Sequence, residues 1–117
     1  MIVENLSSQK QFTTKDGSQI RSILDRANSP VKNQSLAEAT LPPVTSTERH
    51  YHRESEELYF ILEGRGEMEI DGETRVVGPG DAILIPPGAW HQIAALDEMR
   101  FLCCCAPPYS HDDTFFA

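Results

Sequence analysis

Apolar residues gather in short stretches that are separated by turn residues along most of the chain. The stretches span about four to six residues and recur about every 8–12 residues, and no apolar stripe at helical spacing exceeds about two turns. The pattern predicts strands over residues 12–14, 20–24, 48–52, 57–62, 67–70, 74–77, 82–85, 90–93 and 100–104. Short strands at this spacing are typical of an antiparallel sandwich or barrel, so the sequence predicts an all-β fold.

Turn residues mark the points at which the predicted strands reverse. Asp16-Gly17 and Asp71-Gly72 are two-residue hairpin signals between apolar stretches. Four glycines at such points are expected to adopt positive φ or to allow close backbone approach. They are Gly64, Gly72, Gly80 and Gly88.

One stretch, Ser35–Leu41, is ambiguous. Ser35 and Glu38 have the spacing of a helix capping box, but the stretch also alternates between apolar and polar residues. Pro42-Pro43 ends it after a length that suits a strand better than a helix. We therefore favour a strand.

Leu58–Leu62 is apolar at every position and does not alternate. A strand of this kind is expected to be covered on both faces. The barrel interior would cover one face, and either a partner subunit or the N-terminal arm would cover the other. We favour the partner subunit, and therefore a twofold homodimer.

Composition limits the size and the partners of the protein. With 117 residues, 39% of them hydrophobic, we expect a flexible polar segment over 1–10 and a single domain over 11–117. The net charge of −8 repels phosphate backbones and anionic lipids, so nucleic-acid and membrane partners are not expected. The adjacent cysteines Cys103–Cys105 cannot form a spaced disulfide framework, so we expect buried thiols and a cytoplasmic location.

Three histidines and one glutamate are candidates for a metal site. His50 and His52 are two residues apart, so they share one face of a strand. Glu57 follows a turn, and we expect its strand to pair antiparallel with that of the two histidines. His91 comes directly after the predicted turn at 86–88. Three imidazoles and a carboxylate that converge inside a barrel suit a first-row transition metal.

Two spacings in this region resemble the motifs of the cupin family. His50-Tyr51-His52, then Glu57, then Gly64 resembles the first motif, and the segment from Gly80 through Pro86-Pro87-Gly88 to His91 resembles the second. The motifs lie within residues 48–91. The resemblance, to small single-domain RmlC-like cupins, implies a double-stranded β-helix, or jelly-roll barrel. It also implies one divalent transition metal ion (Mn, Fe, Co, Ni or Zn), held by His50, His52, Glu57 and His91.

Two positions depart from the family pattern, and one of the expected ligands has an alternative in the neighbouring residue. Val44 stands where the first motif often begins with glycine, and Ala95 where the second often ends with asparagine. Neither is a ligand position, so the departures concern loop geometry. Glu56 could replace Glu57, but counting back from Gly64 selects Glu57.

The resemblance implies a small metal-dependent enzyme of the dioxygenase, isomerase, lyase or decarboxylase kind, acting on a small oxygen-bearing molecule. A non-catalytic small-molecule-binding cupin and a structural metal site are the alternatives, and the sequence leaves them open. Strand parity predicts a mostly apolar pocket, which suits a small organic ligand. Its predicted walls are Tyr59, Ile61, Ile83 or Leu84, and Phe101. Tyr59 is a candidate catalytic proton donor, although core packing is the role that we favour. Trp90 should point away from His91.

Overall fold

The computed structural model describes residues 1–117 and contains two antiparallel sheets. The six-stranded sheet contains, in spatial order, β1 (Phe12–Thr13), β2 (Gln19–Leu24), β3 (Ser35–Leu41), β10 (Met99–Ala106), β5 (Glu56–Glu63) and β8 (Ala82–Ile85). The five-stranded sheet contains β11 (Thr114–Phe116), β4 (His50–His52), β9 (His91–Ala95), β6 (Gly66–Ile70) and β7 (Glu73–Val77). Short 3₁₀ helices, η1 (Leu6–Ser8) and η2 (His111–Asp113), complete the elements, and none is a helix that could span a membrane.

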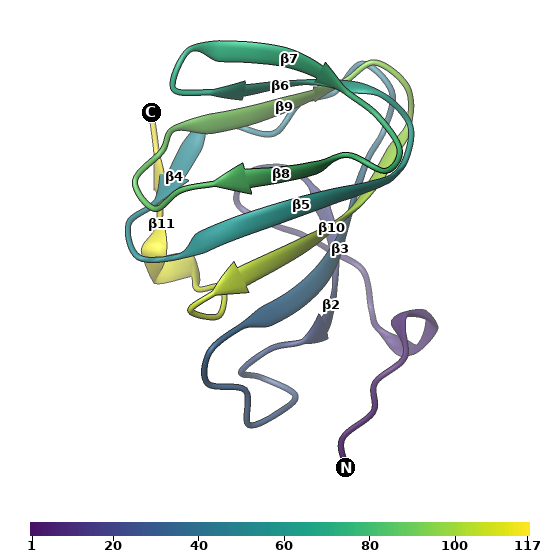
Figure 1. Ribbon diagram of the computed structural model, residues 1–117. Coiled ribbons are helices and arrows are strands. Elements are labelled where there is room, and N and C mark those ends of the chain that lie inside the picture. Colours follow the sequence, from purple (N-terminus) through teal and green to yellow (C-terminus); the bar gives the residue numbers. More distant parts are fainter.

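The predicted all-β jelly-roll fold is confirmed, but the two sheets do not join into a closed barrel (Figure 1). The core lies between the sheets, and strand alternation supplies it. Glu57, Tyr59 and Ile61 on β5 are buried, and on β9 His91 and Ile93 point into the same interior. Twelve buried apolar residues form one cluster there, among them Ile61, Ile93 and Phe101. The interior therefore combines this apolar cluster with a polar region in which the histidines and Glu57 lie.

The observed strands correct several predicted boundaries. The predicted strand over 48–52 begins only at His50, where pairing with His91 of β9 and Phe116 of β11 starts. The ambiguous Ser35–Leu41 is strand β3, paired with both β2 and β10. The C-terminal residues, for which the sequence predicted no element, form η2 and β11.

The expected pairing of the Glu57 strand with the His50–His52 strand is wrong. Strand β4 belongs to the five-stranded sheet, whereas β5 pairs with β10 and β8 in the six-stranded sheet. The turn at 53–55 therefore carries the chain from one sheet to the other. As a result, Glu57 reaches the histidines across the interior and not from a neighbouring strand.

The apolar stretch Leu58–Leu62 is buried on one face and open on the other. Leu58 and Phe60 are 46% and 42% exposed, and Leu84, which pairs with Leu58 on β8, is 54% exposed. Within the single chain the expectation that both faces are covered is therefore not met. A homodimer that covers this outer face stays a prediction.

The four glycines expected at turns all have positive φ. Gly64, Gly72, Gly80 and Gly88 all have φ between 79° and 89°. At Gly64 an added Cβ would overlap the carbonyl group of Glu98, so only glycine fits.

Val44 has a left-handed backbone conformation, which favours glycine. Its φ is +60°, and its amide donates to the carbonyl oxygen of Ala95 at 3.1 Å, so the two positions that depart from the family pattern are in contact. A β-branched residue in this region is strained by about 1–2 kcal/mol. The side chain is 88% exposed and offers no packing in return.

Val44→Gly should therefore raise the free energy of unfolding by about 1 kcal/mol, after the entropy cost of glycine is subtracted. Chemical denaturation measures the change. Val76→Gly is the matched control, because Val76 is also exposed but lies in the extended strand β7. The control should lower stability by about 1 kcal/mol. A loss of stability in both variants would contradict the strain at Val44.

Candidate metal centre

Strands β4 and β9 bring three histidines together in the interior. His50, His52 and His91 are 2%, 4% and 0% exposed. Their ring centroids are 4.2 Å (His50–His91), 5.1 Å (His50–His52) and 5.4 Å (His52–His91) apart. One nitrogen of each ring lies within 4.8 Å of those of the other two. The three predicted histidines thus form one buried cluster, the three-histidine site, which is compatible with a metal ion.

The three imidazoles share one hydrogen-bond arrangement. Each Nδ1 lies next to a backbone carbonyl oxygen: Glu48 for His50 at 2.7 Å, Asp113 for His52 at 3.3 Å, and Ala89 for His91 at 3.0 Å. A carbonyl only accepts, so in the neutral ring Nδ1 carries the hydrogen and Nε2 keeps its lone pair. This is the arrangement that orients and fixes histidine ligands around a metal.

Glu57 faces this cluster from strand β5 of the opposite sheet. Its Oε1 lies 3.3 Å from Nε2 of His52 and 3.5 Å from Nε2 of His91. The thiol of Cys105 donates to the other oxygen, Oε2, at 3.3 Å. Glu57 Oε1 and His91 Nε2 are buried and have no hydrogen-bond partner. Buried polar atoms without partners are costly, and a cation between them would satisfy both.

Charge in the cluster keeps the carboxylate ionised. Burial by itself raises the pKa of Glu57, but the facing imidazoles of His52 and His91, when they carry a proton on Nε2, outweigh it and hold that pKa well below its usual range. Burial lowers the pKa of His50, and the neighbouring His91 lowers it further. Burial also acts to lower the pKa of His52, but Glu57 beside it raises the pKa overall. An ionised carboxylate beside imidazoles suits a divalent cation.

The choice between adjacent glutamates agrees with their burial. Glu57 is 5% exposed and points into the interior, whereas Glu56 is exposed on the outer side of β5. Only Glu57 is therefore placed to contact a cation held by the histidines.

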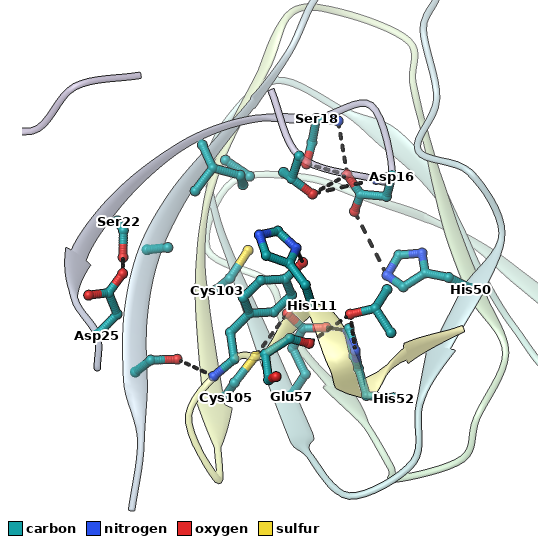
Figure 2. A pocket seen from close by; sticks show the side chains of 18 of the residues that line it. Asp16, Ser18, Ser22, Asp25, His50, His52, Glu57, Cys103, Cys105 and His111 are labelled. Atoms are coloured by element: carbon teal, nitrogen blue, oxygen red, sulfur yellow. Dashed lines mark hydrogen bonds and ion pairs between the residues drawn. The ribbon is translucent and has the colours of Figure 1, made fainter. Parts of the chain in front are cut away.

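A cavity of about 460 Å³ opens beside the histidines (Figure 2). Tyr59 and Phe101 line it as predicted, but Ile61 and Leu84 do not, because Ile61 packs in the core and Leu84 lies on the outer face. Ile83 lines a separate hollow between β6, β7 and β8. Ten of the 25 lining residues are hydrophobic, so apolar and polar side chains share the lining.

Tyr59 is the predicted candidate for proton donation. Its ring centroid lies 6.3 Å from that of His91, and it also packs at 4.7 Å against Phe101. Burial, together with the charge of Glu57, raises its pKa well above the usual value. The hydroxyl therefore stays protonated and is a hydrogen-bond donor at neutral pH.

The residues behind and beside the histidines take the places that parity predicts. Trp90 points away from His91 and packs against Tyr51 at 4.6 Å, with the guanidinium of Arg49 at 5.2 Å from its ring. Cys103 and Cys105 line the cavity. Burial raises the pKa of both thiols, which disfavours their thiolate forms.

Sequence reasoning missed two contributors to the site. Asp16 was interpreted only as a turn residue, yet its Oδ2 lies 3.8 Å from Nε2 of His50. The C-terminal residues were left without a role, yet β11 pairs with β4 and places Thr114 opposite His52. Both depend on contacts between segments distant in sequence, and no local motif indicates them.

Comparisons with known proteins agree with the architecture and with the motifs. The Cupin domain family matches residues 37–105. The uncharacterized protein MJ1618 of Methanocaldococcus jannaschii is 48% identical over 107 residues, covering 90% of this chain and 86% of that protein.

Solved structures share the same fold. A single-residue variant of Streptomyces PAC13 with uridine superposes with a TM-score of 0.83 at 14% identity, covering 100% of this chain and 91% of that chain. The polyketide cyclase RemF from Streptomyces resistomycificus gives a TM-score of 0.78 at 26% identity, covering 97% and 89%. A related structure is described as that of Pac13, a nucleoside dehydratase.

Asp113→Ala tests how the C-terminal segment supports the site. The Asp113 carboxylate accepts hydrogen bonds from the amides of Arg53, Glu54 and Ser55, in the turn that leads from β4 to β5. Its loss should lower the free energy of unfolding by about 1–3 kcal/mol. Asp112→Ala, next to it and exposed, should change stability by less than about 0.5 kcal/mol. Chemical denaturation of metal-free protein measures both, and equal effects would contradict the role of Asp113.

Proposed function

This chain belongs to the cupin family, and we propose that its three-histidine site and Glu57 bind one divalent transition metal ion in a small metal-dependent enzyme. One observation carries the proposal. Two buried, unpartnered atoms, Oε1 of Glu57 and Nε2 of His91, lie 3.5 Å apart, and Glu57 also lines a cavity large enough for a small molecule. A mixed nitrogen and oxygen set suits Mn, Fe, Co, Ni or Zn.

Four protein ligands leave two positions on an octahedral ion for oxygen atoms of a substrate. Such an ion supplies Lewis-acid chemistry or an activated water. The cavity on this side argues against a purely structural role, because a structural site is closed by its ligands. The substrate is then a small, oxygen-bearing organic molecule.

Protic side chains around the cavity favour an isomerase or lyase over an oxygenase. Tyr59 holds its proton and lines the cavity, and the Asp16 carboxylate lies close to His50. Moving a proton between two substrate atoms needs such a donor and such an acceptor. The enzymes among the similar folds, described as a nucleoside dehydratase and a polyketide cyclase, are consistent with this class.

Elemental analysis of protein purified without chelators tests the metal site. Wild type should hold about one transition metal ion per chain, and His50→Ala and His91→Ala should lose it, because each removes one nitrogen ligand. His111→Ala is the matched control, because His111 also lines the cavity but is exposed and lies outside the cluster. Unchanged metal content in His91→Ala, or equal loss in His111→Ala, would contradict the assignment.

The two glutamates provide an independent test. Glu57→Gln should weaken metal affinity by about tenfold or more, whereas Glu56→Gln should leave it within about twofold. Competition with a chromogenic chelator measures both. Weaker binding in Glu56→Gln alone would show that the neighbouring carboxylate is the ligand.

Turnover separates an enzyme from a binding module. Metal-loaded wild type, incubated with a metabolite extract, should deplete one compound and accumulate another, as followed by mass spectrometry. His91→Ala should do neither. Recovery of a compound that is bound but chemically unchanged would support the non-catalytic binding cupin instead.

A further inference from the structure

The hairpin between β1 and β2 places Asp16 beside the three-histidine site, in the lining of the cavity. The Asp16 carbonyl oxygen accepts from the amide of Glu48 at 2.8 Å, which fixes the hairpin to the segment just before β4. Across the turn, the amide of Thr14 donates to the carbonyl oxygen of Ser18 at 3.0 Å. The Asp16 side chain is only 14% exposed. It points toward His50 in Figure 2.

The two oxygens of this carboxylate have different surroundings. Oδ1 accepts from the amide of Ser18 at 2.9 Å and from its hydroxyl at 2.6 Å. Oδ2 has one polar neighbour, Nε2 of His50, at 3.8 Å, which is beyond hydrogen-bond distance. Ser18 thus fixes the orientation of the group and leaves Oδ2 as an open acceptor beside the three-histidine site. A carboxylate oxygen accepts hydrogen bonds only, so a hydroxyl or amine of a ligand is its natural partner.

Charge in the cavity lining disfavours an acidic ligand. Carboxylates of Asp16, Asp25, Glu57 and Asp112 line it, and Arg26, which is exposed, is its one guanidinium. With a divalent ion in the three-histidine site, Glu57 and Asp16 would together balance its two positive charges. Apart from the exposed Arg26, no lysine or arginine of the lining is then left to pair with a phosphate or a carboxylate.

The remaining polar lining is rich in hydroxyl groups. Serines, threonines and tyrosines from the β1–β2 hairpin, the two sheets and the C-terminal segment contribute them, including Thr14, Ser18, Ser22, Tyr59, Ser110 and Thr114. Several of them already donate within the lining, Ser18 to Asp16, Ser22 to Asp25 and Thr114 to the carbonyl oxygen of Ser110, so toward a ligand these hydroxyls act as acceptors. The cavity therefore offers hydrogen bonds in place of ion pairs.

We propose that Asp16 and the surrounding hydroxyls form a hydroxyl-binding subsite that selects an uncharged, hydroxyl-bearing small molecule, of the sugar or nucleoside class, over its acidic derivative. The inference deepens the proposed function and rests on it for the ion that the ligand would also contact. Asp16 acts as a specificity-determining residue, and Ser18 positions it.

Saturation-transfer difference NMR with three matched pairs tests this subsite: ribose and ribose 5-phosphate, glucose and gluconate, and uridine and uridine 5′-monophosphate. Wild type should bind the neutral member of at least one pair and prefer it to the acid. Asp16→Asn should reduce that preference by about tenfold, through weaker neutral binding and tighter acid binding. Ser18→Ala keeps the charge of Asp16 but removes the hydroxyl that orients its carboxylate. This variant should reduce the preference for the neutral compound by about threefold.

Asp112→Asn is the matched control, because it removes the same charge from an exposed position on the same cavity. It should change the preference by less than about twofold. The proposal is overturned if wild type binds none of the neutral compounds. It is also overturned if Asp16→Asn leaves the preference unchanged, or if Asp112→Asn shifts it equally.

Metal content measured on the same samples keeps the two proposals apart. Saturation transfer does not need the ion, so the Asp16 subsite is judged even if wild type holds no metal, a result that would reject only the proposed function. Circular dichroism confirms that each variant is folded. Ser18→Ala provides a second result if Asp16→Asn is not folded.

Discussion

The structure depends on keeping four polar side chains buried between two sheets without enough protein partners to satisfy them. Each imidazole of His50, His52 and His91 has Nδ1 next to a backbone carbonyl, which leaves every Nε2 facing the interior. Glu57 adds a negative charge from the opposite sheet. In a low-dielectric interior this arrangement is costly unless a cation occupies it. The apolar core around it and the open cavity beside it are both arranged about this constraint.

Two chain segments that are distant in sequence from the motifs complete the site. Strand β11 pairs with β4 along its whole length, so the C-terminal residues back the same strand that carries His50 and His52. The β1–β2 hairpin is bonded to the segment just before β4 and brings Asp16 to the cavity. The motif residues thus provide the cluster that could bind an ion, while the β1–β2 hairpin and the C-terminal segment line the cavity beside it.

The sequence predicts the cluster better than its surroundings, for physical reasons. Two-residue spacing fixes the shared face of His50 and His52, and turn chemistry fixes the positive φ at Gly64. Spacing cannot tell which sheet a strand joins after a turn, so Glu57 was assigned to a strand paired with β4. Alternation along the strand predicts that Ile61 points into the interior, but it does not tell how far along the sandwich Ile61 lies. Ile61 was therefore wrongly placed in the pocket wall. Asp16 depends on tertiary contact alone, which no local pattern records.

X-ray absorption spectroscopy at the edge of the metal that copurifies tests the central claim most directly. The account predicts multiple scattering from three imidazoles, with metal–nitrogen distances of about 2.0–2.2 Å and oxygen in the remaining positions. A spectrum with sulfur ligands from Cys103 or Cys105, or with oxygen ligands alone, would contradict it. A protein that retains no metal ion, and in which Glu57 and His91 hydrogen-bond to each other, would also contradict the account.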